Sequence, residues 1–206
     1  AIPKRRKESV ALFQAIVDQH PNHELAPMAL YNAAYGSLDL RDYKSAISKS
    51  SAFEKAYANS DYLADTLEVK ADASLLNDQP EIAEQVFGQL ANQFPDNEKV
   101  SFWNLRSGVA LFLQKKYQPT ITQLSPLVEL FSDPSRQAES LHWIGSSQFH
   151  LKDYTNATQS LSRSNQLNNK WRRADETLLM LCRSQMANGQ VDAGQETATG
   201  LIAGYP

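Results

Sequence analysis

The sequence predicts an all-α solenoid built from one repeated pair of antiparallel helices. The first observation is a period of 37 residues that runs along the chain without an insertion. Small residues recur at this spacing in the first helix of each pair: Ala34, Ala71, Gly108, Gly145 and Cys182. The second observation is a tyrosine that recurs in the turn between the two helices: Tyr43, Tyr117 and Tyr154. A fixed period of this length indicates stacked helical units instead of one globular core.

The composition excludes several classes of protein. Of the 206 residues, 42% are apolar and 21% are charged, as in ordinary folded domains. The net charge is −3, whereas a nucleic-acid surface needs a basic field, so we expect no nucleic-acid partner. No apolar run approaches the roughly 18 residues that a transmembrane helix needs. The single cysteine, Cys182, rules out an intramolecular disulfide and a thiolate metal cluster.

The period divides the chain into a half unit and five complete units. The half unit is 1–21, and the complete units are 22–58, 59–95, 96–132, 133–169 and 170–206. First helices are expected near 24–40, 61–77, 97–115, 134–151 and 171–188. Second helices are expected near 43–57, 80–94, 117–131, 154–167 and 191–203. With the helix of the half unit, this makes about 11 helices. Because the chain does not begin with Met and ends on a unit boundary, we expect a segment of a longer protein.

The half unit consists of a second helix, over residues 4–20, that lacks its first helix. Its apolar residues share one helical face: Val10, Phe13, Ile16 and Val17. Pro21 ends this helix. The helix opens on the basic run Lys4-Arg5-Arg6-Lys7, which is either a reader of anionic patches or a solvated first turn.

Local signals set boundaries in the later units. Asp133 and Pro134 are typical of an N-cap and a first helical residue. Pro126 lies deep in a second helix, so we expect a kink or break near Ser125. Four of the eight glycines fall in the last 18 residues: Gly189, Gly194, Gly200 and Gly204. Each glycine inside a helix costs about 1 kcal/mol relative to alanine. We therefore expect a weak last helix, which either frays or is held by a partner or by residues outside the segment.

The small residues mark the places where the two helices of a pair approach closely. In the first helices a leucine comes four residues before the small residue, as Leu141 comes before Gly145. In the second helices the small residue comes four residues before a large one, as Ala157 comes before Leu161. Side chains four residues apart share a helical face. Cys182 holds one of these small positions and is interpreted as a core residue, with a reactive thiol as the alternative.

This pattern resembles the tetratricopeptide repeat. The clearest match is the set Leu141, Gly145, Tyr154, Ala157 and Leu161, and the likeness covers nearly the whole chain. The usual unit has about 34 residues, whereas this one has 37, and the extra residues fall in the joints between units. The longer joint and the phrase FQAIVDQHP are similar to tetratricopeptide proteins of the Gram-negative envelope, of the outer-membrane assembly and Tol-Pal-associated type. This looser likeness favours the bacterial periplasm or cell envelope, with the cytoplasm as the alternative.

The resemblance implies a right-handed superhelix whose concave groove is lined by first helices and binds an extended or helical peptide. Carried over residue by residue, the groove-lining positions are Met28, Tyr31, Tyr35, Asp65, Glu68, Asp72, Phe102, Leu105, Val109, Phe112, Glu139, His142, Ser146, Phe149, Glu176, Leu179 and Arg183. Within each helix these residues are three or four apart and share one face. The aromatic residues either contact the partner or pack against the next helix. The three acidic residues Asp65, Glu68 and Asp72, in the first helix of the unit 59–95, either recognise a basic partner or form a solvated face.

Four polar residues one turn apart, Glu139, His142, Ser146 and His150, do not predict catalysis. A helix face offers no oxyanion hole, because its N–H groups are bonded internally, and no buried third group orients the histidine. His142 and His150 are separated by roughly 12 Å along a helix, which is too far to share one zinc ion. The sequence therefore predicts no catalytic residue, no metal site and no cofactor.

The functional prediction is a non-catalytic protein–protein interaction scaffold, an adaptor that binds a peptide or protein partner in the concave groove. A partner that presents a carboxylate to a basic clamp is not expected, because the matching positions are mostly acidic or apolar. One alternative is self-association or spacing, with the half unit and the glycine-rich unit as docking ends of a homo-oligomer. The other is a regulatory segment of an enzyme whose catalytic domain lies outside this chain.

Overall fold

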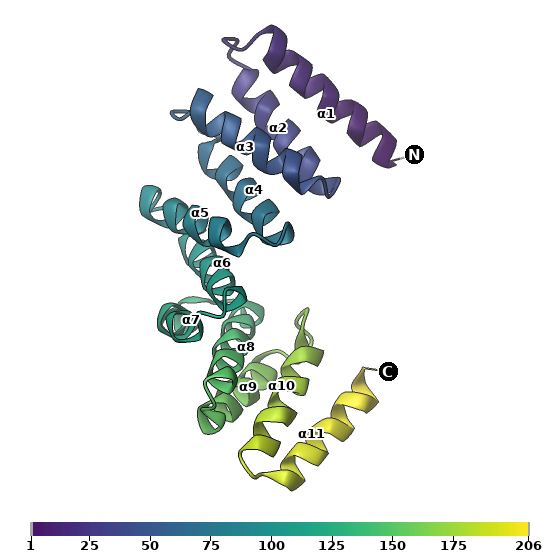
Figure 1. The fold of residues 1–206 in the computed structure, drawn as a ribbon, viewed down its shortest axis with the longest axis vertical. Helices are drawn as coiled ribbons and strands as arrows, with labels where there is room; N and C mark the ends of the chain where they lie inside the picture. The colour runs from purple at the N-terminus through teal and green to yellow at the C-terminus, as the bar shows by residue number, and fades with distance from the viewer. Residues whose placement is uncertain (1, 206) are drawn as a thin grey trace. The chain divides into compact units, whose positions relative to one another are not determined.

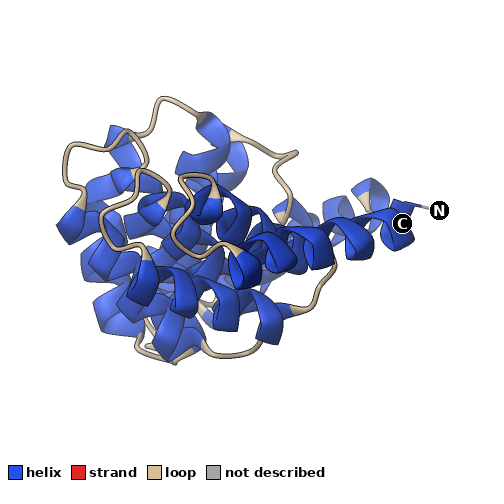
Figure 2. Ribbon diagram, turned by 90° about the horizontal axis from the view of Figure 1, so that it is seen from above, coloured by secondary structure: helices blue, strands red, loops and turns tan. Residues whose placement is uncertain are grey.

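The structure is a computed structural model that describes the backbone of residues 2–205 and the side chains of residues 4–205. Every regular element within this part of the chain is a helix (Figures 1 and 2). The α-helices are α1 (Ile2–Gln19), α2 (Ala26–Asp39), α3 (Tyr43–Ala56), α4 (Leu63–Leu76), α5 (Pro80–Gln93), α6 (Val100–Leu113), α7 (Tyr117–Leu124), α8 (Pro134–His150), α9 (Tyr154–Leu167), α10 (Ala174–Ala187) and α11 (Val191–Gly204). A 3₁₀-helix, η1 (Ser125–Leu130), follows α7. The all-α class and the predicted alternation of first and second helices are confirmed.

The helices form two compact units, residues 1–103 and residues 104–206, and the division falls inside α6. In the first unit the helices α1 to α5 each pack against the next of this series, and α2 also packs against α4. In the second unit α8 packs against α9 and also against α10. These contacts between alternate helices place successive first helices side by side, which is the stacking of a solenoid. No described helix is long and apolar enough to cross a membrane.

The observed helices match the expected ranges, except that most first helices begin two or three residues late. The reason is a tight turn that closes at the end of each joint. In the first joint Ala26 N donates to His23 O at 2.9 Å, and in the last Ala174 N donates to Trp171 O at 3.0 Å. The exception is α8, which begins at Pro134 as predicted because the Asp133 carboxylate caps it by accepting a hydrogen bond from Ser135 N at 2.9 Å.

The turn inside each helix pair has the same backbone in all five complete units. One residue per turn lies in the left-handed region, with φ between 57° and 78°: Arg41, Asp78, Lys115, Lys152 and Gly189. These residues are 37 apart, and only the last is glycine. The residue that follows donates its N–H to a carbonyl five residues earlier, as Asp42 N donates to Ser37 O at 2.9 Å. This is a Schellman motif, which satisfies the last carbonyls of the first helix and reverses the chain.

The small residues lie where the helices of a pair touch, as predicted. A Cβ atom placed on Gly145 would lie 2.6 Å from Leu161 Cγ and 3.2 Å from Leu161 N. A Cβ atom on Gly108 would lie 2.7 Å from Leu124 Cγ. Both leucines are fully buried. Cys182 is half-buried at the equivalent position, and its thiol donates to Gly194 O at 3.3 Å, which supports its structural interpretation.

The predicted break near Ser125 is confirmed. The α-helical hydrogen bonding of α7 ends at Leu124, and the chain continues as η1. Pro126 is the second residue of η1, where its missing N–H costs little. The break still directs Leu127 and Val128 into the core of the second unit.

The glycine-rich last helix, α11, is complete from Val191 to Gly204 but shallow, with Gly194 as its one buried residue. Its end is tied to the preceding joint, because Tyr205 Oη donates to Asn169 O at 2.8 Å. The same bond occurs four periods earlier, where Tyr57 Oη donates to Pro21 O at 2.8 Å. A tyrosine at this position therefore fastens a second helix to the joint before its own unit.

Candidate functional site

A cluster of tyrosines lies where the first helices α2 and α4 meet. Tyr31 stacks on Tyr62, with ring centroids 5.6 Å apart and an interplanar angle of 23°. Tyr35, one turn further along α2, has its ring 6.2 Å from Tyr31 and is 47% exposed. Burial raises the pKa of Tyr31, and the charge of Asp65 raises it further. The Tyr31 hydroxyl therefore stays neutral at physiological pH, and the cluster presents an aromatic surface.

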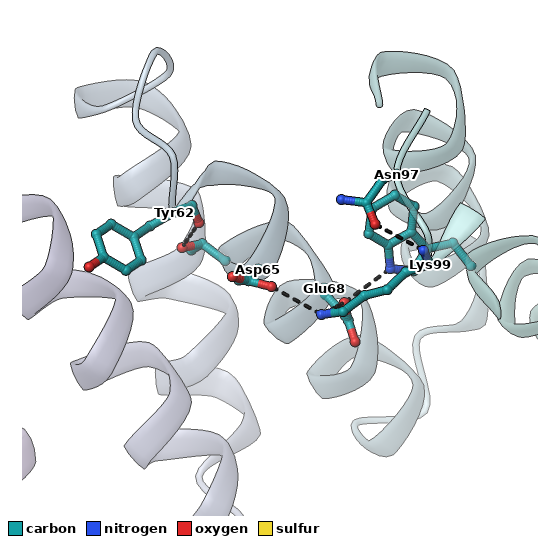
Figure 3. Close-up of polar contacts among 7 residues, drawn as sticks. Tyr62, Asp65, Glu68, Asn97 and Lys99 are labelled. Carbon is teal, nitrogen blue, oxygen red and sulfur yellow. Dashed lines mark hydrogen bonds and ion pairs between the residues drawn. The ribbon is translucent and has the colours of Figure 1, made fainter. Parts of the chain in front are cut away.

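Two carboxylates beside this cluster join α4 to the start of α6. Lys99 Nζ lies 3.1 Å from Asp65 Oδ1 and 3.1 Å from Glu68 Oε2 (Figure 3). Trp103 Nε1 also donates to Glu68 Oε2, at 3.0 Å. Burial alone would lower the pKa of Lys99, but the hydrogen bonds to the two carboxylates outweigh it and raise the pKa. The lysine is therefore held charged between successive first helices.

A hydrogen bond to the backbone of Lys99 fixes the position of this residue. Asn97 Oδ1 accepts a hydrogen bond from Lys99 N at 2.9 Å, which fixes the turn ahead of α6 (Figure 3). The side chain then reaches back along α4 toward Asp65, whose side chain remains 48% exposed. We call the residues Tyr31, Tyr35, Tyr62, Asp65 and Lys99 the first-helix surface. Of the other predicted positions in this unit, Met28, Asp72 and Phe102 are half-buried.

The assignment of Leu105, Val109, His142 and Ser146 to a groove surface is wrong, because all four are buried. Leu105 and Val109 belong to the core of the second unit. His142 is 2% exposed, with Nδ1 3.0 Å from Thr177 Oγ1 of α10. Burial lowers the pKa of His142 to about 3, so its imidazole is neutral. At His142 this face of α8 packs against the next first helix, α10.

Phe112 and Phe149 support the turns, which favours the packing interpretation of these aromatic residues. Phe112 lies edge-on to Tyr117 with centroids 5.6 Å apart, and Phe149 meets Tyr154 at the same 5.6 Å one period later. In these two repeats the turn tyrosine therefore packs on the phenylalanine just before the last residue of the first helix. Both phenylalanines remain half-buried.

The remaining predicted positions of the second unit are at least partly open to solvent. Leu179 is 40% exposed, Arg183 is exposed, and Glu139 and Glu176 are half-buried. Arg173 pairs with Glu176 at 2.6 Å, and its guanidinium lies 4.8 Å from the ring centroid of Trp143. The carboxylate of Glu176 is thus turned toward its own helix start.

The sequence reasoning missed a set of residues at the starts of the first helices that contact the preceding repeat. Three of them lie directly before their helix, and Arg136 lies in the first turn of α8. These residues are 37 apart: Tyr62, Lys99, Arg136 and Arg173. Tyr62 contacts Tyr31 and Lys99 contacts Glu68, each 31 residues earlier, and Arg173 contacts Trp143, 30 residues earlier. The sequence could have indicated these contacts. The 37-residue period and the length of the joint together determine which residues of successive repeats lie 31 positions apart.

The four polar residues Glu139, His142, Ser146 and His150 do not form a common site. His142 and Ser146 are buried, whereas His150 is exposed and stacks on Tyr117 with centroids 4.6 Å apart. Among the described residues no group of three or more His, Cys, Asp or Glu side chains could hold a metal ion.

Solved structures with this arrangement of helices are tetratricopeptide-repeat proteins and similar chains. No family model and no curated protein matches the sequence. BtubC from P. vanneervenii aligns with a TM-score of 0.71 and 13% identity, covering 99% of this chain and 92% of that one. The C-terminal part of a TPR repeat-containing protein from Cytophaga hutchinsonii aligns with a TM-score of 0.73 and 12% identity, covering 97% and 74%. YrrB, described as a TPR protein with an unusual peptide-binding site, aligns with a TM-score of 0.67 and 15% identity, covering 81% and 80%.

Proposed function

We propose that this chain, which has the tetratricopeptide-repeat fold, is a non-catalytic interaction scaffold that binds a partner polypeptide on its first-helix surface. The observation that supports the proposal is Tyr35, a residue that is 47% exposed and whose ring lies 6.2 Å from Tyr31 of the stacked Tyr31–Tyr62 pair. Tyrosine is enriched at binding hot spots because it offers a large rigid ring and a hydroxyl group at a small entropic cost. The peptide-binding site named for YrrB supports the same class of function.

The chemistry of the surface favours a partner segment with a cationic side chain next to an apolar one. The open ring of Tyr35 can hold an ammonium or guanidinium group over its face. The half-exposed carboxylate of Asp65 lies beside the cluster, where its charge contributes to the raised pKa of Tyr31. Lys99 already neutralises part of this charge, so the aromatic contact, and not charge alone, carries the affinity.

The test is selection of displayed peptides on the full chain, followed by affinity measurements with single variants. We expect Tyr35→Ala to weaken binding of the selected peptide by about tenfold or more, as for a hot-spot residue. We expect Asp65→Asn to weaken binding of the peptide less, and added salt to remove the difference in affinity between this variant and the wild type. The control is Leu76→Ala, which truncates another exposed side chain of the same unit, 56% exposed. Equal effects of Tyr35→Ala and Leu76→Ala would reject the surface.

Exposed apolar side chains on the end helices favour self-association as a second candidate function. Leu12 of α1 is 68% exposed, Ile16 is 40% exposed, and Ile202 of α11 is 75% exposed. Ile16 holds the position that Phe53 and Leu90 fill in complete units, where both are fully buried. Light scattering over a range of concentrations tests this function, and a monomer throughout would count against it.

A further inference from the structure

A cavity of about 700 Å³ opens between the helices α9, α10 and α11 of the second unit, whereas the first-helix surface belongs to the first unit. Trp171 and Leu181, 7% and 5% exposed, form apolar walls. Tyr205 stands at its edge. The volume lies within the range of roughly 300–1,000 Å³ of ligand pockets in proteins.

Two helical glycines, Gly200 and Gly204, face this cavity. A Cβ atom on either would meet no atom within 4 Å. They differ from Gly194 of the same helix, where a Cβ atom would lie 2.6 Å from Met186 Sδ. Close packing therefore accounts for Gly194 but not for Gly200 or Gly204. Glycine inside a helix lowers the stability of the helix. At these two positions the absence of a side chain leaves the cavity open.

Side chains fill the equivalent position in the first unit, and they identify the groups that are missing from the cavity. Three 37-residue periods before Asn165, Leu181 and Gly200 stand Glu54, Lys70 and Gln89. Lys70 Nζ donates to Glu54 Oε2 at 2.8 Å, and Gln89 Nε2 donates to Glu54 Oε1 at 3.0 Å. An acceptor at this position is thus satisfied by N–H donors carried on long apolar stems.

Around the cavity, Leu181 and Gly200 replace the two donors Lys70 and Gln89, whereas Asn165 still supplies an acceptor in place of Glu54. Asn165 lines the cavity, and its Oδ1 is buried without a hydrogen-bond partner. A buried acceptor without a partner costs free energy, which a donor brought from outside would recover. Asn165, unlike Glu54, carries no charge that a cation would have to balance, so a neutral N–H group is sufficient as the donor.

We infer that this cavity is a binding site for a tryptophan side chain of a partner polypeptide, whose indole N–H donates to Asn165 Oδ1. An indole is neutral, has a donor and no acceptor, and fills more volume than the missing glutamine. Trp171 and Leu181 receive its rings, and the absent side chains at Gly200 and Gly204 make room for them. The site is independent of the proposed first-helix surface, since it lies in the other unit.

The test is an NMR titration of the full chain with N-acetyl-L-tryptophanamide. Saturable shifts are expected at Asn165, Trp171 and Gly200. The matched probe is the same amide with a methyl group on the indole nitrogen, which fits the cavity but has no donor there. We expect it to bind about fivefold more weakly, as for one lost hydrogen bond. No saturable shift, or equal affinity of the two probes, would overturn the assignment.

A plugged variant separates the cavity from non-specific binding. Gly200→Gln restores the side chain that Gln89 supplies in the first unit and should abolish the shifts. Gly88→Gln is the control, since Gly88 is also helical with no atom within 4 Å of its Cβ position but lies outside the cavity. Circular dichroism verifies that both variants are folded. Binding that survives Gly200→Gln, or that is also lost in Gly88→Gln, would contradict the site.

Discussion

The residue that reverses the chain inside each helix pair is held in a conformation that suits glycine, yet four of the five such residues are not glycine. A side chain in the left-handed region costs about 1–2 kcal/mol. We expect Lys115→Gly to raise the free energy of unfolding by about 1 kcal/mol, measured by denaturant titration. Lys116→Gly, one residue later and outside that region, is the control and should not stabilise. A less stable Lys115→Gly variant would show that the lysine side chain makes a contact that outweighs the strain.

The contact between Gly145 and Leu161 leaves no room for a side chain. Gly145→Leu should destabilise the chain by about 1–3 kcal/mol or more, because even a Cβ atom would lie 2.6 Å from Leu161 Cγ. Gly88→Ala is the matched control, as its Cβ position is open, and it should stabilise by about 1 kcal/mol through helix propensity. Thermal unfolding followed by circular dichroism measures both. An unchanged melting temperature for Gly145→Leu would refute the close approach.

Asp42 links stability to pH. Hydrogen bonds from the Ser45 hydroxyl and backbone N–H lower the pKa of Asp42 below its ordinary value of 3.8. A lowered folded-state pKa means that the ionised carboxylate stabilises the fold above pH 3.8, and that this stabilisation is lost as pH falls through the lowered value. The stability advantage over Asp42→Asn should therefore be present at pH 7 and vanish in acid. A pH-independent difference between the two proteins would contradict this role.

At the scale of the element, caps differ between helices that share one backbone. Asp42 and Asp153 cap α3 and α9 by accepting N–H bonds, whereas Gln190 precedes α11 with nearly the same dihedral angles and no side-chain cap. Gln190→Asp should stabilise α11 by about 1 kcal/mol. Hydrogen exchange of the α11 amides measures it directly, with Gln190→Ala as the control. Unchanged exchange in Gln190→Asp would mean that the start of α11 does not limit the stability of this helix.

The helices themselves could be predicted from the sequence because their signals are local. Proline at residue 126 cannot donate a hydrogen bond, so the end of α7 at Leu124 follows from one residue. The close approach of the helices at Gly145 was predicted from the recurring small residue, whereas its contact with Leu161 was not. Contacts between units are set by the length of the joint and the twist between helices, which no local pattern encodes. This is why His142, polar and predicted on the surface, lies buried against Thr177.

At the scale of the whole molecule, the 37-residue period predicted the fold, since each unit repeats the turn, the small position and the closing residue. The candidate site was predicted only in part. Tyr31, Tyr35 and Asp65 lie on the first-helix surface, but their contacts Tyr62 and Lys99 come from the next joint along the chain. Stability in such a chain is approximately a sum over units and their interfaces. Variants in one unit therefore report on that unit first.

Locating a bound peptide would show whether the first-helix surface of the first unit binds a partner. Hydrogen–deuterium exchange of the full chain, with and without a peptide selected on it, gives that location. We expect slowed exchange over residues 28–35 and 62–68, and a weaker effect in the Tyr35→Ala variant. Protection confined to other helices, or equal protection in Tyr35→Ala, would contradict the claim.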